Sequence, residues 1–236
     1  MRYRTWGLLA LAAAVCACAF GSAADDPPAG GGVVVDKDKR TVVIDAKIAP
    51  RKIDDPRYQK PDGLPYPLEV VACWGFPKGQ KAHETAVTID CKPSDVHKAV
   101  ESLGLKAGKP ENGGDKEPQG PEVSIFLEFQ NEDKETKRVP IEKTMVSVTT
   151  GKAMPKVKWR FTGSAMVQPD PNKDEKVYGA DTTGTLIAIF PVTDLTVFQT
   201  NLTFKDEKYV KLETDKKLVP KEGTPVKVVI ECPEQK

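Results

Sequence analysis

The chain has 236 residues, with 35 basic and 34 acidic side chains and a formal net charge of +1. This balance argues against a protein that binds nucleic acid through a strongly basic surface. The one long apolar stretch lies at the N-terminus, which argues against several membrane spans, and the length is enough for one hydrophobic core or two small ones.

The first 24 residues have the pattern of a secretory signal peptide. Arg2 and Arg4 supply the positive start, residues 8–20 form an apolar run too short for a comfortable membrane span, and small residues at 22–24 suit cleavage by signal peptidase. We therefore expect an exported protein, in the periplasm or at the cell surface.

Two other interpretations of this segment stay open. Residues 15–18 loosely resemble a bacterial lipobox, in which Cys18 would carry the lipid. An uncleaved apolar anchor is the third interpretation. Contact with the membrane as a partner is expected only through a lipid anchor at Cys18.

Removal of residues 1–24 would leave 212 residues (236 minus 24) with a net charge of −1, because Arg2 and Arg4 are lost. All 20 prolines remain and make up about 9% of the mature chain, against a usual value of about 5%. This composition predicts many turns and loops around a thin core, and it argues against a large helical bundle.

Three cysteines remain in the mature chain, at positions 73, 91 and 232. An oxidising compartment favours one disulfide, and Cys73 and Cys91 are the pair closest together in the chain. The third cysteine would stay free. Spacing alone does not decide the pairing.

The N-terminal part of the mature chain is predicted to be a tether followed by a β-hairpin. Residues 25–32 are rich in Asp, Pro and Gly, as flexible tethers are. Residues 33–35 and 41–48 are β-type runs joined by a charged turn. We assign 25–39 to the tether and the first hairpin strand.

One convincing helix is predicted, at about 94–103. Ser94 or Asp95 can cap its start, and Gly104 ends it. Its apolar stripe consists of Val96, Val100 and Leu103.

The rest of the chain is predicted to be mainly β-structure. Further candidate strands are 67–74, 85–89, 123–129, 156–163, 176–179, 185–190 and 225–231. The fold class is therefore α+β and β-rich, with mostly antiparallel sheets and one short amphipathic helix. A loop rich in Gly, Pro and charge at 106–121 is either a surface insertion or a subdomain break.

Several runs of the chain carry a resemblance to a known family. They are 69–73, 81–85, 96–104, 159–164, 178–181, 184–188 and 223–226. Together they resemble the YdjY-like domain of exported bacterial proteins, many of them from planctomycetes, over residues 40–232. The run Cys…Lys-x-His-Glu is the most specific part.

The resemblance implies little about activity, because the family is uncharacterised. Some members carry a ferredoxin-like label. A [4Fe–4S] cluster needs about four cysteine ligands, so three scattered cysteines do not support it, and no cofactor is expected.

The candidate ligand-binding site consists of Cys73, Lys81, His83 and Glu84. A strand end carrying Cys73 would face a turn carrying a base, an imidazole and a carboxylate. A Cys–His pair within hydrogen-bond reach would give a thiolate nucleophile, and Lys81 would lower the thiol pKa further. In the structural alternative, Cys73 packs as a small apolar residue or pairs with Cys91, and His83 and Glu84 share a turn hydrogen bond.

No metal site is expected from the sequence. Cys73, His83, Cys91 and His97 form a Cys₂His₂ set, but their gaps match no zinc-finger pattern. Residues 170–181 place oxygen ligands as in an EF-hand loop, but they lack its glycine and its flanking helices.

These observations favour an exported, non-enzymatic domain that binds a small ligand or a protein partner, because no catalytic set is complete. The competing hypothesis is a thiol-dependent or metal-assisted enzyme centred on Cys73 and His83. A nucleic-acid partner is not expected, and the identity of the ligand or partner stays open.

Overall fold

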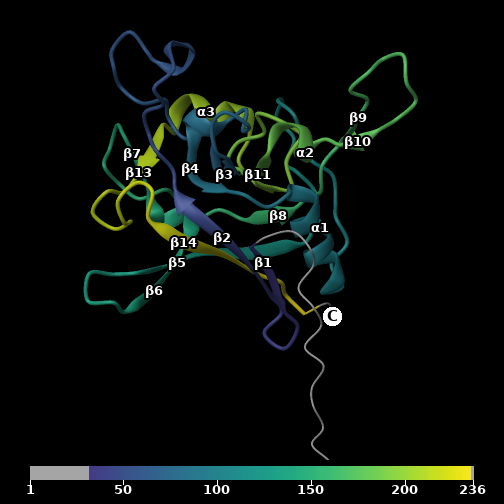
Figure 1. Cartoon of the computed structure of the whole chain (residues 1–236), viewed down its shortest axis with the longest axis horizontal. Helices are drawn as coiled ribbons and strands as arrows, with labels where there is room; N and C mark the ends of the chain where they lie inside the picture. Colours follow the sequence, from purple (N-terminus) through teal and green to yellow (C-terminus); the bar gives the residue numbers. More distant parts are fainter. Residues whose placement is uncertain (1–31, 235–236) are drawn as a thin grey trace, which may run out of the picture.

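The computed structural model describes residues 32–234, which are built around one large β-sheet (Figure 1). Eight of its strands close into a barrel, because β2 pairs with β14 on one side and with β4 on the other. The ring runs β2 (Thr41–Ile48), β14 (Pro225–Glu231), β5 (Glu122–Gln130), β8 (Trp159–Phe161), β12 (Phe198–Thr200), β11 (Thr185–Ala188), β3 (Val70–Trp74) and β4 (Thr85–Ile89). Outside the ring, β1 (Val33–Asp36) pairs with β2, and β6 (Thr136–Pro140) pairs with β5.

The sheet is mixed, which corrects part of the prediction. The pairs β3–β4 and β11–β12 are parallel, whereas the other six pairs of the ring are antiparallel. Parallel neighbours need a crossover connection, and no local turn signal announces such a pair in the sequence.

Four short strands lie outside the large sheet. They form the pairs β9 (Met166–Val167) with β10 (Val177–Tyr178), and β7 (Met145–Ser147) with β13 (Leu212–Thr214). The first pair is the base of an arm that projects from the barrel (Figure 1).

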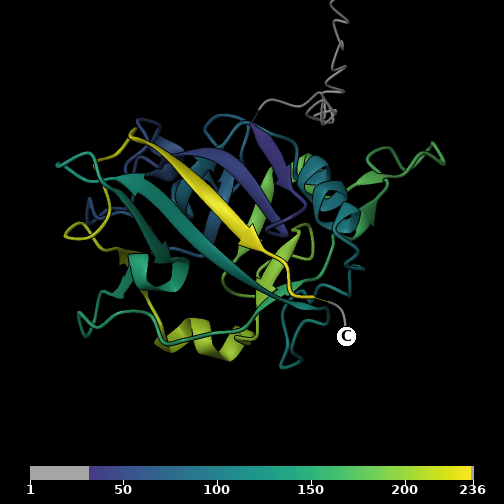
Figure 2. The ribbon, with the colours of Figure 1, turned by 90° about the horizontal axis from the view of Figure 1, so that it is seen from below.

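The predicted helix is present as α1 (Pro93–Ser102), which packs beside β1 and β2 (Figure 2). The expectation of one helix is an undercount, because α2 (Ala180–Thr183) and α3 (Phe204–Tyr209) are also present. Three 3₁₀ turns complete the described elements: η1 (Pro56–Tyr58), η2 (Ala82–Glu84) and η3 (Ile141–Thr144).

The predicted N-terminal cap of α1 is wrong, whereas Gly104 does follow the C-cap residue Leu103, with a positive φ of 88°. Its N-cap residue is Lys92, which makes no side-chain cap, and the amide of Ser94 donates to Asp181 Oδ1 at 2.8 Å. The cap comes from a distant part of the chain, so local sequence could not reveal it.

The hydrophobic core fills the barrel. On β2, Val42, Ile44 and Ala46 point inward, and Asp45 and Lys47, which alternate with them, are exposed. This alternation follows from the two-residue period of a strand. Between residues 32 and 234, no helix is long and apolar enough to cross a membrane.

The segment 106–121 connects α1 to β5, and strands from both sides of it belong to the same barrel. The predicted signal peptide, the lipidation candidate Cys18 and residues 25–31 of the tether lie outside the described residues.

Candidate functional site

Three of the four predicted site residues lie together around the turn η2, between β3 and β4. Lys81 Nζ lies 2.9 Å from Glu84 Oε2, and His83 Nε2 lies 3.5 Å from Glu84 Oε1. Glu69, which no sequence pattern indicated, joins them, and its Oε2 lies 2.6 Å from Lys81 Nζ. The amine is thus held between two carboxylates.

The opposite charges of this cluster stabilise one another, although burial and the neighbouring Glu84 carboxylate raise the pKa of Glu69. Burial alone would raise the pKa of Glu84, but hydrogen bonds from His83 and Lys81 lower it to about 2. Burial alone would lower the pKa of Lys81, but the carboxylates of Glu69 and Glu84 outweigh it and raise that pKa. The Lys81 amine therefore stays protonated and is not available as a base.

Cys73 lies on β3 and is completely buried. Burial raises the pKa of its thiol to about 11, and the opposing effects of the Lys81 amide and the Thr185 hydroxyl are smaller. Among the described residues, no hydrogen bond joins Cys73 to His83. The arrangement does not activate the thiol as a nucleophile.

The expected Cys73–Cys91 disulfide is not formed, because all three cysteines of the described chain are free and buried. Cys73 packs with Val70 and Ala188, whereas Cys91 belongs to the main core. The two thiols therefore lie in different packing environments although they are close in sequence.

Aromatic rings enclose His83. The centroid of its ring lies 4.6 Å from that of Tyr58 and 5.0 Å from that of Tyr66, the second in an edge-on arrangement. His83 Nδ1 is buried without a hydrogen-bond partner. A smaller hollow of about 260 Å³ opens beside Tyr58.

Arg51 holds the segments around His83 together through hydrogen bonds. Its Nε donates to Glu213 Oε1 at 2.6 Å, and its Nη1 donates to the carbonyls of His83 and Thr85 at 3.2 Å each. Its Nη2 donates to the Tyr66 carbonyl. No sequence pattern pointed to Arg51, Tyr58 or Tyr66, because each is a single residue in the largely irregular segment between β2 and β3.

The second histidine lies in another environment. His97 Nδ1 lies 2.7 Å from the Tyr178 hydroxyl, and its Nε2 lies 3.2 Å from Glu101 Oε1. Over residues 32–234, no group of three or more His, Cys, Asp or Glu side chains is arranged to hold a metal ion.

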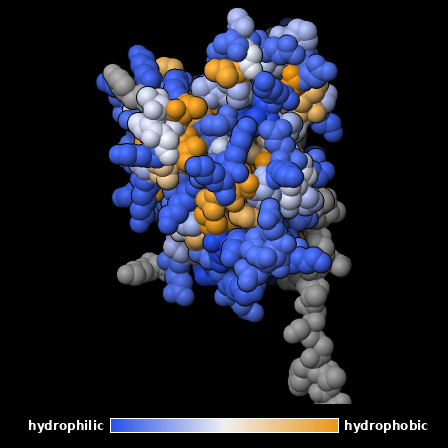
Figure 3. All heavy atoms as spheres, turned by 90° about the vertical axis from the view of Figure 1, so that its left-hand side faces the viewer, coloured by the Kyte–Doolittle hydropathy of each residue, from blue (hydrophilic) through white to orange (hydrophobic). Residues whose placement is uncertain are grey.

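The surface offers no dominant apolar patch on the face drawn in Figure 3. Hydrophobic side chains gather there in several small groups, separated by hydrophilic ones. Small scattered groups of this kind are ordinary on soluble domains and do not by themselves indicate a binding site.

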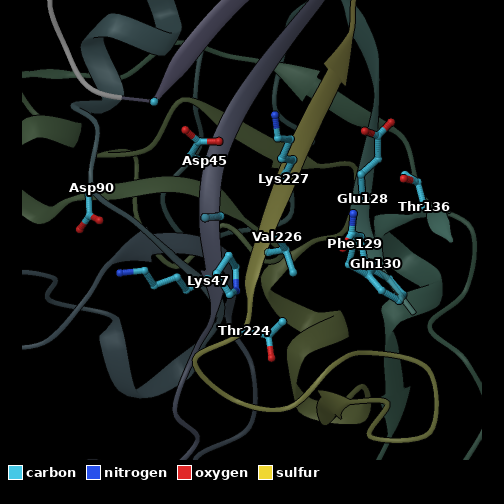
Figure 4. A pocket seen from close by; sticks show the side chains of 13 residues that line it. Asp45, Lys47, Asp90, Glu128, Phe129, Gln130, Thr136, Thr224, Val226 and Lys227 are labelled. Atoms are coloured by element: carbon cyan, nitrogen blue, oxygen red, sulfur yellow. The ribbon is translucent and has the colours of Figure 1, made fainter. Parts of the chain in front are cut away.

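The larger of the two described hollows lies elsewhere and was not predicted. It has a volume of about 910 Å³ and runs over β2, β14 and β5 (Figure 4). Its charged lining residues are Asp45, Lys47, Asp90, Glu128 and Lys227. We call it the groove.

Register explains how the groove collects its charges. Lys227 on β14 lies opposite Asp45 on β2 and opposite Glu128 on β5. Glu128 Oε1 lies 3.4 Å from Arg138 Nε of β6. Within the described structure, Asp45, Lys47 and Lys227 form no ion pair. These three charges are free to meet a partner.

The sequence carried part of this signal. Asp45 and Lys47 alternate with Ile44 and Ala46 in the sequence, a pattern typical of a strand with one polar face. The strand order, which places the C-terminal strand between β2 and β5, could not be read from the sequence, and it is this order that assembles the charges.

A family model described as the YdjY domain matches residues 33–231, from the first residue of β1 to the last of β14. The match therefore covers the whole barrel. No curated protein and no solved structure matches the chain.

Proposed function

This chain belongs to the YdjY domain family, and we propose that it acts outside the cytoplasm by binding a protein partner rather than by catalysis. The observation that carries the proposal is the groove, which combines a volume of about 910 Å³ with free charges of both signs. Complementary charges on two surfaces speed the association of the correct partners and disfavour the binding of wrong ones. The export signal predicted at 1–24 supports an extracytoplasmic location.

The state of the reactive groups supports binding over catalysis. The Cys73 thiol is buried with a raised pKa, and the Lys81 amine is held between carboxylates. His83 packs between the rings of Tyr58 and Tyr66. A thiol-dependent reaction would require Cys73 to become exposed, and no described feature favours that change.

The test uses a displayed library of short random peptides, panned against the chain from Asp25 onward. We expect recovered peptides to carry charges of both signs. Lys227→Glu should weaken their binding at least about tenfold, because the new carboxylate would repel the acidic groups of the peptide that the Lys227 amine attracts. Isothermal titration calorimetry with the recovered peptides measures the loss.

Matched variants make this test specific. Lys176→Glu reverses an exposed charge on the projecting arm, and Cys73→Ala removes the buried thiol. Neither should change peptide binding. Binding that survives Lys227→Glu but is lost in Cys73→Ala would overturn the proposal.

Thiol labelling separates the two hypotheses independently of any peptide. With a pKa of about 11, on the order of one Cys73 in a thousand is a thiolate at pH 8. Ellman's reagent should therefore label Cys73 only after unfolding. Rapid labelling in the native state would favour the enzyme hypothesis.

A further inference from the structure

The groove belongs to a wider sheet surface, which we call the outer face. It consists of the outward-pointing residues of β2, β14, β5 and β6. Figure 2 shows β2, β14 and β5 on the near side of the molecule, with no described element in front of them. This inference rests on the proposed function, because it names the partner that the groove receives.

Two rows of side chains cross the outer face at right angles to the strands. The charged row is Asp45, Lys227, Glu128 and Arg138, and the apolar row beside it is Val43, Val229, Phe126 and Pro140. Val229 lies outside the core cluster that holds its neighbours Val228 and Ile230 and points outward by strand alternation, but it is only 3% exposed.

The charged row is complementary to itself, although its Arg138 also contacts Glu128 at 3.4 Å and Glu231 at 2.5 Å within one chain. Its signs alternate in the order negative, positive, negative, positive from β2 to β6. When the row is reversed end to end, every charge meets its opposite. A surface with this property is complementary to itself, as a two-fold symmetric interface requires.

We propose that a second copy of this chain docks on the outer face, around a two-fold axis parallel to the strands and lying between β14 and β5. Lys227 then faces Glu128 of the second copy, and Asp45 faces its Arg138. The long lysine side chains of each copy project into the groove of the other.

The apolar row obeys the same symmetry. Val229 faces Phe126 of the second copy, and Val43 faces its Pro140. Val229 is only 3% exposed, and Arg138 of the same chain covers the Phe126 ring at 4.2 Å, so this row adds little contact area. An axis at right angles to the strands would instead set the charged row against the apolar row and bury charges without partners, which is costly. The strand-parallel axis alone matches both rows.

The size of the outer face predicts a weak dimer. Four strands about 4.8 Å apart and seven residues long, at about 3.3 Å per residue, span on the order of 450 Å². Two such surfaces bury about 900 Å², below the roughly 1,200 Å² of standard stable complexes. The dimer should therefore form at high micromolar concentration and dissociate on dilution.

Sedimentation equilibrium on the chain from Asp25 onward, over a wide concentration range, tests the proposal. Lys227→Glu and Glu128→Lys should each raise the dimer dissociation constant at least about tenfold. The double variant should restore dimerisation to within about threefold, because it again pairs opposite charges across the axis. Lys176→Glu is the matched control and should change nothing.

The double variant restores opposite charges within each copy as well as across the axis, because residues 227 and 128 are also neighbours in register. Crosslinking is therefore needed to separate the two effects. The double variant leaves Asp45 beside a like charge inside each copy, since residues 45 and 227 are neighbours in register. Recovery of the dimer despite this local repulsion supports pairing across the axis. Failure to recover, with a native circular dichroism spectrum, overturns the proposed axis.

Crosslinking tests the register directly. Chains carrying Lys227→Cys and chains carrying Glu128→Cys should form an interchain disulfide when mixed and oxidised, and much less when either is oxidised alone. The native cysteines are buried and do not compete. Equal crosslinking in all three samples overturns the register.

The outcomes distinguish this inference from the proposed function. A chain that stays monomeric at every concentration, while Lys227→Glu still abolishes peptide binding, refutes the second copy as the partner and leaves the binding proposal standing. A monomeric chain that binds no peptide refutes both.

Discussion

Arg51 and Glu84 are the two charged residues that the fold buries between positions 32 and 234. A guanidinium has five donors and no acceptor, so its burial requires several oxygens in one place. Arg51 finds them in Glu213 and in three backbone carbonyls, which come from segments far apart in sequence. The contact ties the Pro-rich loop to η2 and β13.

Replacement of Arg51 by Met should therefore destabilise the protein strongly. It leaves the Glu213 carboxylate and the carbonyls without their donor, and breaking a buried pair in this way costs about 3–5 kcal/mol. Urea unfolding followed by circular dichroism gives the loss in free energy.

Arg57→Met is the control, because the Arg57–Asp55 pair lies at the surface, with the Arg57 side chain 73% exposed. Exposed pairs contribute little, so this variant should unfold like the parent protein. Equal effects of the two variants would contradict the role given to Arg51.

At the scale of elements, the buried side of α1 follows from local sequence, whereas its N-terminal cap depends on a tertiary contact. The spacing of Val96 and Val100 places an apolar stripe on one side, and both residues are buried as that spacing predicts. The start of the helix depends on Asp181 of α2, which accepts from the Ser94 amide.

Asp181→Ala should cost about 1 kcal/mol of stability, the usual effect of losing a helix cap. Thermal unfolding of the variant and the parent measures it. Ser94→Ala keeps the backbone amide that donates to Asp181, so it should leave the stability nearly unchanged. If Ser94→Ala cost as much as Asp181→Ala, the cap would be local after all.

The whole molecule is held together by closure of the barrel. β14 comes last in the chain and lies between β2 and β5, with antiparallel pairing to both. Without it, two long strands lose their ladder on one side, and the core beneath them opens to water.

A chain that ends at Thr224 should therefore fail to fold, with no cooperative transition in urea and no native circular dichroism spectrum. A chain that ends at Pro233 keeps β14 and should unfold as the parent does. Cooperative unfolding of the shorter chain would show that the sheet folds without β14 between β2 and β5.

The candidate site was predictable only where its residues are close in sequence. Lys81, His83 and Glu84 fall within one turn, so their proximity follows from chain geometry alone. Glu69 joins them because parallel pairing sets Val70 beside Thr85. The disulfide prediction used the same reasoning from proximity and was wrong, because Cys73 and Cys91 pack in different clusters.

By itself, the sequence determined the β-rich character of this protein, its one substantial helix and the alternation that turns one face of each long strand outward, because these depend on the local periods of hydrophobic residues. Only the tertiary structure decided the strand order. That order places β14 between β2 and β5, sets Lys227 between Asp45 and Glu128, and so creates the groove. Pairing between distant strands depends on the packing of the whole core, which no local pattern records.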